Sequence, residues 1–243
     1  MKEVLKTAIS IFLKLIIVNF MCGVIVVSLT LIASGFFSET VGYNAFGTKE
    51  GSDKTDSLYS YYYADGEDAL RSEYEAQGYT ITESPIRELS SKGNTVAMLV
   101  AQFLCLMMLC SFVYPKLWQL GASDSNLVHF KHKKEDKLKG LKIGGITIIP
   151  AVVLLIVLFT MKNGILSEFP VAIYKLLNSS LYGFVEFAAG NAKTFSELSV
   201  LNFVLMLASQ LVIPIITYIS YILGYKNISV GEKIIYKKDN KKG

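Results

Sequence analysis

Residues 143–161 read IGGITIIPAVVLLIVLFTM and contain no charged side chain. The hydrocarbon core of a bilayer is about 30 Å thick, so a helix that spans it needs about 20 mostly apolar residues. In lipid, backbone N–H and C=O groups find no water, and a helix bonds them within its own segment. This stretch therefore predicts a membrane-spanning helix.

Three other blocks have the same character, at residues 8–37, 96–118 and 198–225. The chain is 52% hydrophobic, which differs little from a soluble domain, but its apolar residues are gathered in these long blocks. The first block could instead be a cleaved signal peptide; its length and the internal Lys14 favour a span. We predict an all-α membrane protein with a four-helix transmembrane bundle.

This interpretation divides the chain into eight segments. They are an N-terminal segment with the first span (1–37), an acidic loop (38–95), the second span (96–118), a basic loop (119–142), the third span (143–161), a loop (162–197), the fourth span (198–225) and a lysine-rich tail (226–243).

The segments between the spans alternate between basic and acidic or neutral, and the loop at 162–197 has no net charge. The loop at 119–142, counted with Lys116, has seven lysines against three acids, and the tail has six lysines against two acids, so each carries a net charge of +4. The loop at 38–95 has 11 acids against five bases, a net charge of −6. Because basic segments stay in the cytoplasm, we predict a multi-pass plasma-membrane protein with both termini inside.

The acidic loop is long enough for a small folded unit. Asp65-Gly66 is a turn signal, residues 68–77 fit a short helix that Gly78 ends, and residues 79–82 alternate like a strand. A cluster of four tyrosines could contact a partner, or could form an aromatic belt or the core of the loop, which we favour. The cluster consists of Tyr59, Tyr61, Tyr62 and Tyr63.

The second outside loop contains an apolar stretch at 170–189. Lys175, Asn178, Tyr182 and Glu186 recur at helical spacing, which predicts one amphipathic helix at the outer surface or dipping between the spans. A fifth span would put the lysine-rich tail outside, against the charge rule. The sequence therefore favours four spans and one surface helix.

Two further segments carry specific expectations. Pro214 lacks an N–H group, so we expect the fourth span to kink near Val212. The basic loop predicts a helix that starts at Ser123 or Asp124 and a charged helix over residues 131–139.

Motifs for catalysis and cofactors are missing from the sequence. Both histidines, His129 and His132, lie in one basic stretch that repels cations, so we expect no metal site and no histidine-activated nucleophile. Glycine-rich phosphate loops and zinc-protease motifs do not occur. The sequence therefore predicts no enzyme activity, no cofactor and no nucleic-acid binding.

The lysine-rich tail is typical of a segment that contacts anionic lipid headgroups. We expect this contact from Lys237, Lys238, Lys241 and Lys242.

One stretch carries a resemblance. Its residues are Leu120-Gly121, Asp124, Asn126, Val128 and Phe130, followed by Asp136 and Gly140-Leu141-Lys142-Ile143-Gly144. This pattern resembles a signature of small uncharacterised multi-pass membrane proteins of Gram-positive bacteria. The resemblance covers about a tenth of the chain. It implies a bacterial plasma membrane and carries no activity.

Two functions follow from these features. The first is a non-enzymatic accessory or interaction protein, as a subunit of a larger membrane complex or as a homo-oligomer. The apolar spans, the acidic loop and the basic inner face favour it. The alternative is a small oligomeric transporter or channel, with polar side chains of the second and fourth spans lining the path. These side chains are Gln102, Ser209, Gln210 and Thr217, beside the kink at Pro214, with Ser220 nearby.

Overall fold

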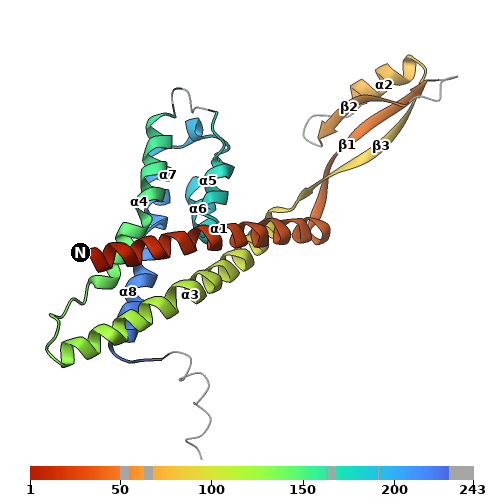
Figure 1. Ribbon diagram of the computed structural model, residues 1–243. Coiled ribbons are helices and arrows are strands. Elements are labelled where there is room, and N and C mark those ends of the chain that lie inside the picture. The colour runs from red at the N-terminus through yellow and green to blue at the C-terminus, as the bar shows by residue number, and fades with distance from the viewer. Residues whose placement is uncertain (50–54, 63–67, 163, 165–167, 191, 230–243) are drawn as a thin grey trace, which may run out of the picture. The chain divides into compact units, whose positions relative to one another are not determined.

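The computed structural model describes residues 1–49, 55–62, 68–162, 164, 168–190 and 192–229. Within them, four helical segments are long and apolar enough to cross a membrane (Figure 1). They are α1 (Lys2–Phe36), α3 (Ser91–His129), α4 (Lys139–Thr160) and the pair α7 (Val200–Ser209) and α8 (Val212–Tyr225). The four predicted apolar helices are therefore present, and the first three begin earlier than the sequence indicated.

The chain forms two compact units. One unit consists of residues 1–27 and 98–243 and holds most of the helices. The other, Ser28–Ala97, contains a small β-sheet.

The sheet has three antiparallel strands in the order β2-β1-β3. They are β1 (Ser38–Lys49), β2 (Thr55–Tyr62) and β3 (Tyr79–Leu89), and the helix α2 (Asp68–Ala76) packs against β3. The short helix predicted at residues 68–77 is thus confirmed, and Gly78 follows it with φ 82°. The prediction of an all-α fold is therefore confirmed only in part: the four long apolar helices are present, but this loop is built on a sheet.

The strand predicted at residues 79–82 is longer than expected. It continues through Pro85, which lies opposite Tyr43 of β1. Proline lacks the N–H that a central strand would need, but β3 is an edge strand and has a partner on one side only. Pro85 therefore interrupts the alternating strand pattern in the sequence, but it does not end the strand.

In the larger unit, α4 packs along α8 and also contacts α7 (Figure 1). Glycines permit the close approach. A Cβ on Gly140 would lie 2.6 Å from the Cβ of Tyr221, and one on Gly144 would meet Thr217 and Pro214. Likewise, Gly121 of α3 lies against the backbone of α8. Small residues at helix contacts let membrane helices pack by van der Waals attraction.

The fourth apolar segment is broken between α7 and α8, as the proline predicted. Pro214 cannot donate to the carbonyl of Gln210, which instead accepts a 3.3 Å bond from the N–H of Ile213. The N–H of Gln210 likewise donates to Leu207, three residues back, at 3.2 Å. The break therefore falls at Gln210 and Leu211.

Residues 170–189 do not form one amphipathic helix. They form α5 (Val171–Leu177), the 3-10 turn η1 (Ser179–Leu181) and α6 (Tyr182–Ala189), with Asn178 between the first two. The stem of this helical hairpin is closed by a bridge between Pro170 and Thr194. The expected polar stripe fails because the chain reverses, so that Lys175 and Glu186 face each other across the hairpin, 2.8 Å apart.

The basic loop also differs from the prediction. The helix α3 runs without interruption to His129, so no helix starts at Ser123 or Asp124. Residues 130–138 form turns and irregular chain in place of the charged helix predicted at 131–139. The reason lies in Asp124 and the lysines, which bind one another and do not cap separate helices.

Candidate functional site

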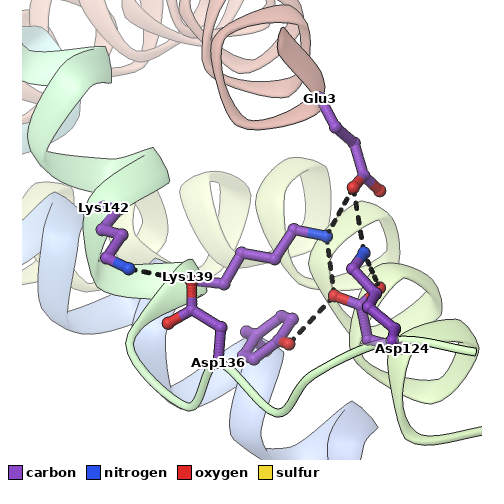
Figure 2. A network of polar contacts seen from close by, with 7 residues as sticks. Glu3, Asp124, Asp136, Lys139 and Lys142 are labelled. Carbon is purple, nitrogen blue, oxygen red and sulfur yellow. Dashed lines mark hydrogen bonds and ion pairs between the residues drawn. The ribbon is translucent and has the colours of Figure 1, made fainter. Parts of the chain in front are cut away.

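A buried network of charges joins α1, α3, α4 and α8 at one end of the helical unit (Figure 2). At its centre, Lys139 Nζ lies 2.6 Å from Asp124 Oδ2, with both side chains nearly excluded from solvent. The hydroxyl of Tyr221 donates to the same oxygen at 3.0 Å. The carboxylate of Asp124 thus connects α3 with α4 and α8.

The half-buried Lys133 and the exposed Glu3 complete the network. Lys133 Nζ lies 2.7 Å from the other oxygen of Asp124 and 3.0 Å from Glu3 Oε2, which also lies 3.0 Å from Lys139 Nζ. Two acids and two lysines therefore balance in charge. A buried pair is tolerated where the remaining hydrogen-bonding sites are satisfied, as they are here.

The electrostatics of Lys133 follow from this arrangement. Burial acts to lower the pKa of its ammonium group, but the hydrogen bonds to Asp124 and Glu3 outweigh it and raise the pKa above the ordinary lysine value. Lys133 is therefore held in its charged form near neutral pH.

A second polar cluster lies at the tip of the helical hairpin. The backbone N–H of Ser180 donates to Asn19 Oδ1 of α1 at 3.0 Å. Gln102 of α3 accepts from the N–H of Gly183 at 2.7 Å and donates to the carbonyl of Ser180 at 3.3 Å. Two side chains of α1 and α3 thus satisfy the backbone groups that the turn leaves open.

Beside this tip is a cavity of about 440 Å³ between α1, α4, the hairpin and the break before α8. Its walls are mainly apolar, with Asn19, Asn178, Ser180 and Gln210 among the polar residues. Gln210 is fully buried, and its Nε2 donates to the hydroxyl of Tyr174 at 3.3 Å. Its Oε1 has no hydrogen-bond partner among the residues that the structure describes.

Of the residues predicted to line a transport path, not all are among the lining residues of this cavity. Gln210 lines the cavity, whereas Gln102 is bonded to the hairpin backbone. The hydroxyl groups of Ser209, Thr217 and Ser220 each donate to a carbonyl of their own helical segment, at 2.7, 2.9 and 2.7 Å. Pro214 is buried against Gly144.

The tyrosine cluster is divided. Tyr59 is half-buried and its ring stacks on Tyr74 of α2, with centroids 5.5 Å apart, so it contributes to the small core of the sheet unit. The backbones of Tyr61 and Tyr62 lie in β2 opposite Tyr43 and Gly42, and their side chains lie outside the described part. Tyr63 and the four tail lysines Lys237, Lys238, Lys241 and Lys242 also lie outside the described residues.

Sequence reasoning missed the roles of Glu3, Asn19, Lys139, Tyr174 and Tyr221. Asn19 interrupts an apolar block, and this polar side chain was the one available signal of an internal hydrogen bond. Lys139 looked like any other lysine of a basic loop. Within the described residues, no group of three or more histidine, cysteine, aspartate or glutamate side chains could hold a metal ion.

The residues behind the family resemblance have structural roles. Gly121, Gly140 and Gly144 lie where helices touch α8, Asp124 is the centre of the charge network, and Asp136 Oδ2 lies 2.8 Å from Lys142 Nζ (Figure 2). Comparison with known proteins adds no relative: no family model, no curated protein and no solved structure matches the chain.

Proposed function

We propose that the chain is a non-enzymatic accessory protein of the plasma membrane, which binds a partner protein through the unit at Ser28–Ala97. The observation that carries the proposal is that this loop between two apolar helices is a separate compact unit with its own sheet and helix. Folding such a unit is unnecessary for a loop that only connects two spans.

The charges support an orientation with this unit outside and both termini inside. The two lysine-rich segments flank the opposite ends of the spans from the acidic loop, in agreement with the rule that basic segments stay in the cytoplasm. In this orientation the hairpin of α5 and α6 enters from the outside and returns, and its backbone is bonded by Asn19 and Gln102. Irregular backbone at membrane depth requires such burial in protein.

The unit offers an open strand edge and an acidic surface. Within the described residues β2 pairs with β1 on one side only, and Asp56 and Ser60 of β2 are exposed. Residues 38–95 carry a net charge of −6. An open edge admits a further strand, and complementary charge steers association, so the expected partner presents a basic segment.

In-cell photo-crosslinking tests the proposal. A photoreactive amino acid replaces Asp56 at the β2 edge, and a matched variant carries it at Ile219, an exposed apolar position of α8. We expect one discrete heavier product from position 56 that position 219 does not give, and mass spectrometry then identifies the captured protein. Absence of a discrete product from position 56 and from the neighbouring exposed Ser57, with correctly inserted protein, would contradict the proposal.

The tail is proposed to bind anionic headgroups through its four lysines. A tail peptide should co-sediment with vesicles containing phosphatidylglycerol and remain free with neutral vesicles. Equal behaviour with both would show that the lysines contribute nothing at the membrane.

A transporter or channel is the second candidate, and the break at Gln210 favours it. Discontinuous helices beside a cavity with buried polar groups are typical of transport sites. The candidate predicts that liposomes containing the protein pass a solute and that Gln210→Leu slows this flux at least severalfold. If Gln210→Leu does not change the flux, the transport candidate is contradicted and the accessory role is the remaining one.

A further inference from the structure

The cavity beside the hairpin has a few polar residues in a mainly apolar wall. Two of them, Gln210 and Asn178, are almost fully buried. Asn178 Nδ2 donates to the carbonyl of Tyr174 at 3.0 Å, while Gln210 Nε2 donates to the hydroxyl of that residue. Tyr174 therefore fixes both amides.

One acceptor atom of the lining residue Gln210 is left without a hydrogen bond. Gln210 Oε1 is buried and has no hydrogen-bond partner in the described part of the chain. A buried polar atom in this state is destabilising, and nearly all such atoms in native proteins are paired. An occupant with a donor group would supply the missing bond.

The rest of the cavity defines what else the occupant must be. None of its lining residues is charged, so a phosphate or carboxylate would lie there without a counter-charge. Leu15 and Phe20 of α1, Leu154 of α4 and Leu177 of α5 contribute apolar walls. Its volume of about 440 Å³ falls in the usual range for small-molecule pockets.

We propose that this cavity binds an uncharged single-chain lipid with a hydroxyl head group, such as a long-chain primary alcohol. The hydroxyl donates to Gln210 Oε1, and the alkyl chain lies along the walls formed by α1 and α4. A hydroxyl also fits if the amide of Gln210 is turned over, because it both donates and accepts. The site is independent of the accessory role, which uses the sheet unit.

Three photoreactive probes of equal chain length test the ligand class on the purified full-length protein in nanodiscs. One ends in a hydroxyl, one in a carboxylate and one in a methyl group. We expect the alcohol to label residues 12–20 and 176–180 saturably, and an excess of unlabelled alcohol to remove the label. The carboxylate and alkane probes should compete at least about tenfold less well, since neither can donate a bond to Gln210 at neutral pH.

Two variants separate the hydrogen bond from the space. Gln210→Leu should weaken competition by the alcohol about three- to tenfold and leave alkane labelling unchanged. Leu154→Trp should fill the cavity and abolish labelling by all probes, while Gln210 itself stays unchanged. The matched control is Ser209→Ala, at a buried neighbour whose hydroxyl is bonded to Met206. Each variant must elute as a single species before it is labelled.

Specific outcomes would overturn the proposal. Equal competition by alcohol and alkane, or an alcohol response that Gln210→Leu leaves unchanged, would mean that a water molecule bonds Gln210 and that the cavity admits any lipid chain. Stronger competition by the carboxylate would reverse the assignment of charge. Weaker competition by the alcohol in Gln210→Met, which has a side chain of similar size, together with normal elution would confirm the role of the amide.

Discussion

The ammonium group of Lys139 lies 2.6 Å from a carboxylate oxygen of Asp124, and each of these side chains is buried. Removing one partner leaves the other charge without compensation, which costs about 3–5 kcal/mol in known buried pairs. We therefore expect Asp124→Asn to destabilise the helical unit by about 3 kcal/mol. Asp124→Asn with Lys139→Met should recover part of this loss. Unfolding titrations of the single and double variants measure both effects, and additive losses would contradict the pairing.

Helix contact at Gly144 gives the second prediction. A methyl group there would overlap Thr217 and Pro214, whereas a methyl group on the adjacent Gly145 meets nothing within 4 Å. We expect Gly144→Ala to lower the free energy of unfolding by about 1–3 kcal/mol, as overpacking does. Gly145→Ala should be neutral or slightly stabilising. A thermal-shift assay on the two neighbours compares them, and equal stability would refute the close packing of α4 and α8.

The hairpin anchor gives the third. Gln102→Leu removes one acceptor and one donor, which leaves the N–H of Gly183 and the carbonyl of Ser180 unpaired. A buried unpaired group costs about 1–3 kcal/mol, so the hairpin should open locally. Hydrogen exchange at residues 178–183 should rise in this variant and stay at the wild-type rate in the exposed control Phe103→Leu. An unchanged exchange rate would show that the hairpin stands without α3.

The contact between α1 and α3 gives the fourth prediction. Cys22 Sγ lies 3.9 Å from the carbonyl oxygen of Cys105, and Cys105 Sγ lies 4.0 Å from that of Cys22. A mild oxidant should therefore join these two thiols and leave Cys110 free. With a protease site inserted at residues 51–53, the joined fragments remain together on a non-reducing gel. Fragments that separate in the Cys110→Ser background would disprove this contact.

The pH dependence of the network gives the fifth. The raised pKa of Lys133 means that its contribution to stability is present below the ordinary lysine pKa, about 10.4, and is lost as the pH rises through the higher folded value. The groups that face it are Asp124, Glu3 and Lys139. We expect the midpoint temperature of the wild type to fall between pH 10 and 12 more steeply than that of Lys133→Arg, because arginine stays charged. Parallel curves would contradict the prediction.

Much of the helical architecture could be predicted from the sequence, because uncharged blocks of sufficient length have few alternatives. The break before Pro214 was also predictable, since a missing N–H acts locally. The reversal at Asn178 was not. Its cause is a set of partners, Asn19 and Gln102, that lie about 160 and 80 residues earlier in the chain.

The candidate site was predicted only in part. Gln210 could be selected as a polar residue in an apolar block. The cavity that it lines depends on how α1, α4 and the hairpin pack, which the sequence does not show. The sheet was hidden for another reason: β1 contains glycine, asparagine and serine, which weaken the strand pattern, and β3 contains Pro85. Whether such segments form strands depends on their pairing with strands that are distant in the sequence.

The bonds at the hairpin tip join residues that are translated at different times. Asn19 and Gln102 are both translated before residue 178, so the groups that hold the tip have already left the ribosome when the hairpin emerges. A hairpin of two short helices lacks the length by which the translocon recognises a span. In the proposed orientation, the hairpin therefore reaches the membrane after the groups of α1 and α3 that bond its tip, and before α7 and Gln210, which also contact it.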